Sequence, residues 1–175
     1  MKKGRNQAYR IAYYGIAGTL CIVLSLLESI LVPYIPGLPP GAKPGLANVV
    51  IMLMAAMGEQ SGLLFPVLVK AGFVLLTRGA SAFFMSLAGG LFSMAVMLVL
   101  FRLRLKSVSA AGIGILSACA HNLGQLLVSM VYTGTGAMIF YLPVLMVFGA
   151  VTGLCTGIFT AVLLPYVRKL TVYIK

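Results

Sequence analysis

The chain alternates long apolar stretches with short polar or glycine- and proline-rich segments. A helix needs about 20 apolar residues to cross a bilayer, with a range of about 17–25. On this criterion the pattern predicts six membrane-spanning helices in a single integral membrane domain covering residues 1–175. The spans are expected at 11–32, 46–58, 62–77, 81–101, 110–132 and 141–164. The second and third ranges are short and nearly contiguous, so they form either a tight helical hairpin or two helices extended by their flanks.

Composition agrees with a multi-pass protein of the cell membrane. Hydrophobic residues make up 61% of the chain and charged residues only 9%, whereas soluble domains carry about 25% charged residues. The net charge of +11 does not indicate nucleic-acid binding, because the basic residues sit in clusters between apolar runs. Clusters of this kind mark cytoplasmic loops. They fall before the first span, between the fourth and fifth, and after the sixth, which predicts that both termini are cytoplasmic.

No metal or cofactor site is expected. Cys21, Cys119 and Cys155 all fall inside apolar runs and form no CxxC pair. Small buried packing residues are therefore the better interpretation of the three cysteines.

A proline-rich loop is predicted on the extracytoplasmic side, between the first two spans. It includes the run PGAKPGLANVV at residues 40–50. Irregular backbone near a membrane must be buried in protein or line a wet cavity. The loop is either an ordinary surface turn or a gate over an outward-facing pocket, and nearby polar residues favour the gate. Its prolines are Pro33, Pro36, Pro39, Pro40 and Pro44.

Scarce polar side chains within the spans are the candidate binding residues, because ionisable groups in lipid cost at least ~2.5–3.5 kcal/mol and normally face a cavity or a partner. Two alternatives stay open: Glu28 and Lys70 form a structural pair or a ligand site, and His121 is a packing residue or a ligand contact. Three cations against one carboxylate in the outer half predict an anionic solute. The expected binding residues are Glu28, Lys43, Asn48, Lys70, Arg78, His121, Asn122 and Gln125.

Small residues recur at helical spacing in several spans. The sixth span carries Gly149, Gly153 and Gly157 four residues apart. Such ladders permit close helix packing in membranes, here either within the chain or against a partner. The first span carries Ala8, Ala12 and Gly15. These three lie near the cytoplasmic edge, where a membrane partner could dock.

Three motifs carry a resemblance to a known family. PGAKPGLANVV, SLAGGLFS at 86–93 and AHNLGQLLVS at 120–129 resemble the Gx transporter family, which is also described as heptaprenyl diphosphate synthase component I. That family in turn resembles the S components of energy-coupling-factor (ECF) transporters. This second resemblance implies a six-helix bundle and a loop after the first helix that closes over a vitamin-like ligand. It also implies small residues on that helix that dock an energising membrane subunit with ATPases.

The sequence argues against an enzyme. Prenyl chain elongation needs aspartate clusters that hold Mg²⁺, but the only acidic residues are Glu28 and Glu59. No nucleotide-binding motif is present, so any ATP-driven step must come from partners. The leading hypothesis is a solute-binding subunit for uptake of a small anionic or vitamin-like compound. The alternatives are a non-catalytic accessory component of heptaprenyl diphosphate or isoprenoid-quinone synthesis or of flavin-linked electron-transfer assembly, and a purely structural scaffold.

Overall fold

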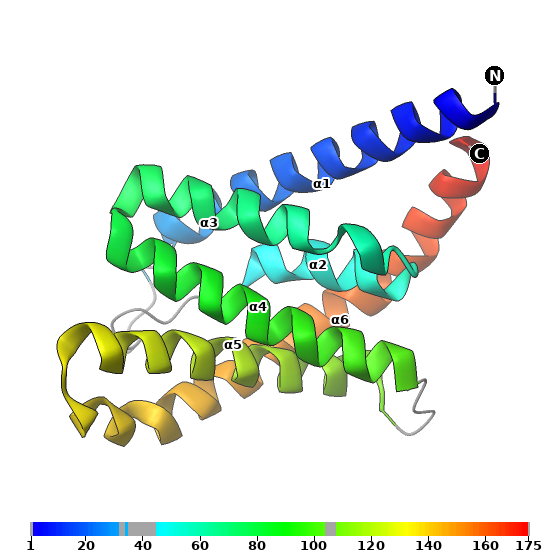
Figure 1. Cartoon of the computed structure of the whole chain (residues 1–175). Coiled ribbons are helices and arrows are strands. Elements are labelled where there is room, and N and C mark those ends of the chain that lie inside the picture. Colours follow the sequence, from blue (N-terminus) through cyan, green and yellow to red (C-terminus); the bar gives the residue numbers. More distant parts are fainter. Residues whose placement is uncertain (1, 32–33, 35–44, 104–107, 175) are drawn as a thin grey trace.

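The computed structural model describes residues 2–31, 34, 45–103 and 108–174, with backbone only for residues 2–8 and 170–174. Within these residues the chain forms six α-helices, two short 3-10 helices and no strand. The α-helices are α1 (Lys2–Leu31), α2 (Leu46–Ala56), α3 (Leu64–Arg78), α4 (Ala80–Leu103), α5 (Ala110–Thr133) and α6 (Leu142–Ile174), and the 3-10 helices are η2 (Gln60–Gly62) and η3 (Gly136–Tyr141). Consecutive α-helices run in opposite directions along one bundle (Figure 1).

Glycines in the left-handed region end two of the helices. Gly79, at φ 85°, separates α3 from α4, and Gly134, at φ 65°, follows the last residue of α5. Only glycine adopts this region without a steric penalty. At its other end α5 begins with Ser109, whose hydroxyl accepts a hydrogen bond from the Gly112 amide at 3.2 Å. Local sequence therefore fixes the turns at which the chain reverses direction.

In the part of the chain that the structure describes, five helices are long and apolar enough to cross a membrane. Their ranges are Tyr9–Leu31, Gln60–Arg78, Ala80–Leu103, Ala110–Thr133 and Gly136–Lys169. They correspond to the first, third, fourth, fifth and sixth predicted spans. The helix predicted at 46–58 is present, but α2 has only 11 residues. At 1.5 Å per residue it is about 16 Å long, short of the ~30 Å hydrocarbon core. The described residues thus form an all-helical fold with five candidate membrane spans, which is compatible with a multi-pass membrane protein.

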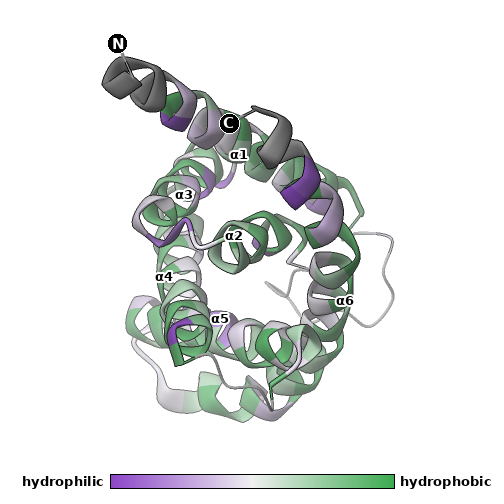
Figure 2. Ribbon diagram, turned by 90° about the vertical axis from the view of Figure 1, so that its right-hand side faces the viewer, coloured by the Kyte–Doolittle hydropathy of each residue, from purple (hydrophilic) through white to green (hydrophobic). Residues whose placement is uncertain are grey.

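The short helix α2 lies in the middle of the bundle, with the other five helices arranged around it (Figure 2). It packs on α1, α4 and α6 and touches α3. Eight of its 11 residues are buried, among them Ile51, Met52 and Met54. A helix that is apolar all round is expected to be enclosed by others rather than to lie at a surface. Its first turn carries the polar exception, Asn48.

The glycine ladder of α6 packs inside the chain, against α5. A Cβ atom added to Gly153 would lie 2.5 Å from the Gly114 carbonyl oxygen, and one added to Gly157 would lie 2.5 Å from the Ala110 carbonyl oxygen. The two backbones therefore approach too closely for any side chain. Of the two interpretations of the ladder, internal packing is confirmed.

Arginine side chains lie at both ends of the bundle, with several at one end and Arg78 at the other. The first turns of α1 and the last turns of α6 lie at the same end and extend beyond the other helices (Figure 1). Hydrogen bonds place Arg10 and Arg168 there, beside the α2–α3 connection. Arg102 lines a hollow at this same end. At the opposite end, Arg78 closes α3 and donates to Ser29 Oγ at 2.8 Å.

Candidate functional site

Two buried charged side chains meet the first turn of α2. The Glu28 carboxylate of α1 accepts a hydrogen bond from the Leu46 backbone amide, and Lys70 Nζ of α3 donates to Asn48 Oδ1 at 3.1 Å. Glu28 is 1% exposed and Lys70 is 4% exposed. A carboxylate at a helix N-terminus is stabilised by the unpaired amides and the helix dipole. Neither hydrogen bond joins Glu28 to Lys70, because each side chain binds α2 instead.

The face of α1 that reaches this turn is set by helical spacing. Cys21, Ser25 and Glu28 are four and three residues apart, and all three are buried. Side chains at this spacing share one face of a helix. Cys21 Sγ lies 3.6 Å from the Ala47 carbonyl oxygen and donates to it. Glu28 binds Leu46 and Lys70 binds Asn48, the residues on either side of Ala47. The two charges therefore occupy the same region of the interior.

A small polar cavity lies on another side of the same turn, between α2, α5 and α6. Its lining residues are Gly45, Asn48, Gly114, Ser117, Ala118, His121, Asn122, Thr152 and Thr156. Its volume is about 10 Å³, which is roughly the minimum that holds one water molecule. Asn48 belongs to both clusters, because its Oδ1 binds Lys70 while the residue lines the cavity. Polar groups from α1, α2, α3, α5 and α6 thus converge on one helical turn.

Three hydroxyl groups of the cavity wall can act only as hydrogen-bond acceptors toward a bound molecule. The hydroxyl hydrogens of Ser117, Thr152 and Thr156 are all donated to carbonyl oxygens of their own helices, at 3.0, 3.3 and 2.9 Å. Asn122 donates from Nδ2 to the Leu145 carbonyl oxygen at 2.7 Å. A hydroxyl has one hydrogen and two lone pairs, and a side-chain amide oxygen only accepts. Hydroxyl lone pairs and the Asn122 amide oxygen therefore remain available at the wall.

The structure brings three of the predicted binding residues directly to the cavity, namely Asn48, His121 and Asn122. Glu28 and Lys70 bind the same turn of α2 but do not line the cavity. Gln125 is buried one turn further along α5, and its Cγ lies 2.9 Å from where a Cβ of Gly89 would be. It packs against α4 at that point.

The remaining predicted residues lie elsewhere. Arg78 is exposed, joins the ends of α3 and α1 through Ser29, and does not line the cavity. Lys43 and the five gate prolines, Pro33, Pro36, Pro39, Pro40 and Pro44, lie outside the described residues. In the predicted docking face, Ala12 and Gly15 are exposed, and a Cβ atom added to Gly15 would meet nothing within 4 Å in the part of the chain that the structure describes. Ala8 belongs to α1 but its side chain is outside the described set.

Three hydroxyl-bearing residues of the cavity wall were not among the predicted binding residues, namely Ser117 of α5 and Thr152 and Thr156 of α6. For the two threonines, the signal in the sequence was their four-residue repeat beside the glycines of α6, which places them on the face that approaches α5. A threonine on a helix face that packs closely on another helix places its hydroxyl at the interface. This spacing therefore indicates a row of polar groups between α5 and α6.

The two carboxylates of the chain cannot act together. Glu28 lies at the start of α2, whereas Glu59 follows its end and accepts from Tyr14 Oη at 3.4 Å. About 16 Å of helix separates them. Among the described residues, no group of three or more histidine, cysteine or acidic side chains is placed to hold a metal ion.

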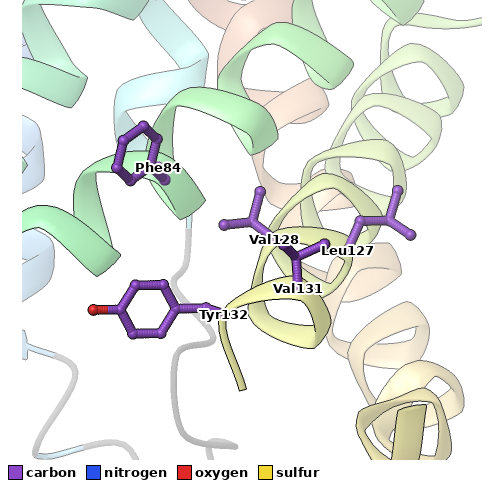
Figure 3. A pocket seen from close by; sticks show the side chains of 5 residues that line it. All are labelled: Phe84, Leu127, Val128, Val131 and Tyr132. Atoms are coloured by element: carbon purple, nitrogen blue, oxygen red, sulfur yellow. The ribbon is translucent and has the colours of Figure 1, made fainter. Parts of the chain in front are cut away.

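A hollow near the C-terminal end of α5 is apolar and lies at the surface. It has a volume of about 360 Å³ and is lined by Phe84, Leu127, Val128, Val131 and Tyr132 (Figure 3). Val131 is 84% exposed. In a bilayer, acyl chains would fill such a groove, so its shape alone indicates no specific ligand.

Comparison with known proteins gives one match. No curated protein and no solved structure is significantly similar to the chain. The match is to a family profile, and it covers residues 18–163. This range includes the Glu28–Lys70 cluster, the cavity and the glycine ladder. The chain therefore belongs to the family described as heptaprenyl diphosphate synthase component I.

Proposed function

We propose that the chain is a membrane-embedded solute-binding subunit, similar in architecture to the S component of an ECF transporter, and that partner proteins energise uptake. One observation carries this proposal: polar side chains of five helices converge on the first turn of α2, inside an otherwise apolar bundle. Buried polar groups in a membrane protein are costly and usually mark a substrate or ion pathway. A scaffold alone would not need them at one place.

The chemistry of the cavity favours a particular kind of solute. The hydroxyl oxygens of Ser117, Thr152 and Thr156 would accept hydrogen bonds from N–H or O–H groups of the bound molecule. Lys70 is the buried cation that binds a cavity residue, through Asn48, and it is the candidate partner for an anionic group. We therefore propose a small solute that carries both hydrogen-bond donors and an anionic group.

Binding requires the cavity to open. Sites for vitamin-sized ligands occupy about 300–1,000 Å³, whereas this cavity measures about 10 Å³. The first turn of α2 forms one wall, and it directly follows the proline-rich segment 33–45. We propose that this segment is the gate and that its movement displaces the first turn of α2. Because proline fixes φ, such a segment has few conformations and suits a hinged cover.

The end of the bundle that carries Arg10, Arg102, Arg168 and Lys169 is proposed to face the cytoplasm, following the positive-inside rule. The short helix α2, extended by its flanking segments, would then complete the sixth crossing. A fluorescent protein fused after Lys175 is expected to mature, and alkaline phosphatase inserted after Thr135 is expected to be active. Activity of phosphatase fused at the C-terminus, with none at Thr135, would contradict the orientation.

The solute-binding proposal can be tested with two valine variants of α6. Thr156 lines the cavity, whereas Thr160, one turn away, is buried outside it. The full chain is purified gently and analysed by native mass spectrometry for a retained small molecule. Thr156→Val removes an acceptor and should lower retention about five-fold, the cost of one hydrogen bond of ~1 kcal/mol. Thr160→Val should retain as much solute as the unmodified chain.

Both variants keep side-chain shape, so each should unfold at nearly the same temperature as the parent chain. Equal retention of the small molecule by the two variants would mean that the cavity is not part of the solute-binding site. Recovery of no small molecule from the unmodified chain, in detergent and in native membranes, would count against the solute-binding role itself.

A second function is favoured by the family name, which describes one component of a heptaprenyl diphosphate synthase. The chain would then be a non-catalytic accessory subunit, because its two carboxylates lie at opposite ends of α2 and it contains no aspartate. The exposed Ala12 and Gly15, with Ala8, are the proposed docking face for a membrane partner in either role. Affinity purification of the chain would separate the two: an energising membrane subunit with ATPases supports uptake, and a prenyl synthase supports the accessory role.

A further inference from the structure

A second polar hollow lies at the far end of α2 from the solute cavity. It has a volume of about 270 Å³ and is lined by Ala55, Ala56, Gly58, Gln60, Phe101 and Arg102. Its walls come from the last turn of α2, from the start of the α2–α3 connection and from the last turn of α4. Polar and apolar groups therefore meet in one open recess at the cationic end of the bundle.

Cations from three helices surround this recess. Arg10 of α1 donates to Ser61 Oγ at 3.1 Å, and Arg168 of α6 donates to the Ala56 carbonyl oxygen at 3.4 Å. Arg102 of α4 is exposed on the recess wall and makes no hydrogen bond or ion pair with any residue that the structure describes. The nearby carboxylate, Glu59, already accepts from Tyr14. The recess thus has an excess of positive charge and one guanidinium without a partner in the described chain.

The carbonyl oxygens at the C-terminal end of α2 are not hydrogen-bond partners of Arg102. The carbonyl oxygens of Leu53, Met54 and Ala55 accept from the amides of residues 57, 59 and 58, and that of Ala56 accepts from Arg168. These are the four carbonyls that a helix C-terminus normally leaves unpaired. All four already accept a hydrogen bond, and none of these bonds comes from Arg102.

We propose that this recess binds a phosphate or diphosphate group. A guanidinium is planar and pairs with two phosphate oxygens at once, which makes arginine well suited to such groups. The Gln60 amide can donate a further hydrogen bond, while Phe101 and Ala55 provide an apolar wall beside it. At the boundary between membrane and water this combination fits an amphiphile with a phosphorylated head, either a phospholipid or a free phosphorylated compound.

Inorganic diphosphate is the probe for this site. Of the three cysteines expected to be buried, Cys21 is fully buried, whereas Cys119 is half-buried and Cys155 is exposed. The full chain, with Cys119 and Cys155 replaced by alanine, is therefore heated in a nonionic detergent with a thiol-reactive dye that reports exposure of Cys21. Diphosphate should raise the unfolding temperature in a saturable manner, relative to sodium chloride of equal ionic strength. Arg102→Gln should weaken the apparent affinity for diphosphate at least ten-fold. Arg102→Lys should weaken it less, because lysine keeps the positive charge but cannot pair with two phosphate oxygens in the planar geometry of a guanidinium.

Arg78→Gln is the matched control, since Arg78 is an exposed arginine at the opposite end of the bundle. It should leave diphosphate binding unchanged. Without diphosphate, Arg102→Gln should unfold within about 2 °C of the parent chain, because an exposed side chain with no partner contributes little to stability. If Arg102→Gln and Arg78→Gln respond alike to diphosphate, or the parent chain does not respond, the proposal is overturned.

A second set of titrations, in lipid bilayers, distinguishes the two possible sources of the phosphate group. The same titration is repeated in bilayer discs of phosphatidylcholine alone and of phosphatidylcholine with phosphatidylglycerol at four to one. Loss of the diphosphate effect in the anionic discs supports a lipid headgroup as the occupant, and an unchanged effect supports a soluble phosphorylated compound. Absence of any Arg102-dependent effect in both kinds of disc overturns the site in a bilayer.

Discussion

Replacing Gly114 with valine is expected to separate α5 from α6 and to leave little folded protein. A Cβ atom at this position would lie 2.2 Å from the Gly153 carbonyl oxygen and 2.8 Å from the Gly157 amide nitrogen. Both atoms belong to the α6 backbone, so no side-chain rotation relieves the clash. Overpacking a well-packed core costs about 1–3 kcal/mol and sometimes more. Here two backbones must move apart, so we expect a loss above about 3 kcal/mol.

Gly72→Val provides the control for this experiment. Gly72 lies within α3, and a Cβ atom there would meet nothing within 4 Å. Both substitutions change the same residue type inside a helix, so helix propensity affects both alike. The thiol-dye unfolding assay, together with the yield of monodisperse protein, should show Gly72→Val close to the parent chain and Gly114→Val strongly destabilised. Equal unfolding temperatures for the two variants would mean that the helices do not pack through these glycines.

The glycine ladder also illustrates how far sequence can predict packing. The spacing of Gly149, Gly153 and Gly157 indicated close approach of a neighbour, and the structure provides one in α5. The spacing could not identify α5, because every other span in the chain was an equally good candidate. Identity of the neighbour depends on how all the helices fit together, which is not a local property.

Helix α2 shows the same limit for span counting. Its apolar run, 46–58, was predicted to be a membrane-spanning helix, and the helix is present but enclosed by the others. Hydropathy does not distinguish a helix that faces lipid from one that is enclosed by other helices, since both need apolar surfaces. The 11-residue length and the nearly uniform apolar surface are the features that favour an enclosed helix.

For the candidate site, sequence identified side-chain types more readily than their roles. Asn48, His121 and Asn122 stood out because polar residues are rare inside apolar runs, and they do lie together. Thr152 did not stand out, because threonine commonly satisfies its hydroxyl within its own helix, as it does here. The position of Glu28 at the start of α2 depends on how α1 packs against that helix. No pattern within α1 alone could have predicted it.

Replacing Lys70 with methionine is expected to lower the unfolding temperature by about 10 °C. Removing one charge from a buried set leaves the other uncompensated, at a cost of about 3–5 kcal/mol for directly paired groups. The counter-charge here is Glu28, which is 1% exposed. Because Lys70 and Glu28 both bind α2 rather than each other, we expect the lower value, about 3 kcal/mol. For a chain of this length that corresponds to about 6–12 °C.

The double variant Lys70→Met/Glu28→Gln tests whether charge compensation is the cause. Glutamine keeps an oxygen that can accept from the Leu46 amide, so the start of α2 stays capped while the unpaired negative charge is removed. We therefore expect the double variant to recover at least half of the loss seen for Lys70→Met. No recovery would mean that the loss comes from the Lys70–Asn48 hydrogen bond and from packing, and that Glu28 and Lys70 are independent. Recovery would establish that the two charges form one electrostatic unit around α2, and an anionic group entering beside Lys70 would then have to compete with Glu28 for it.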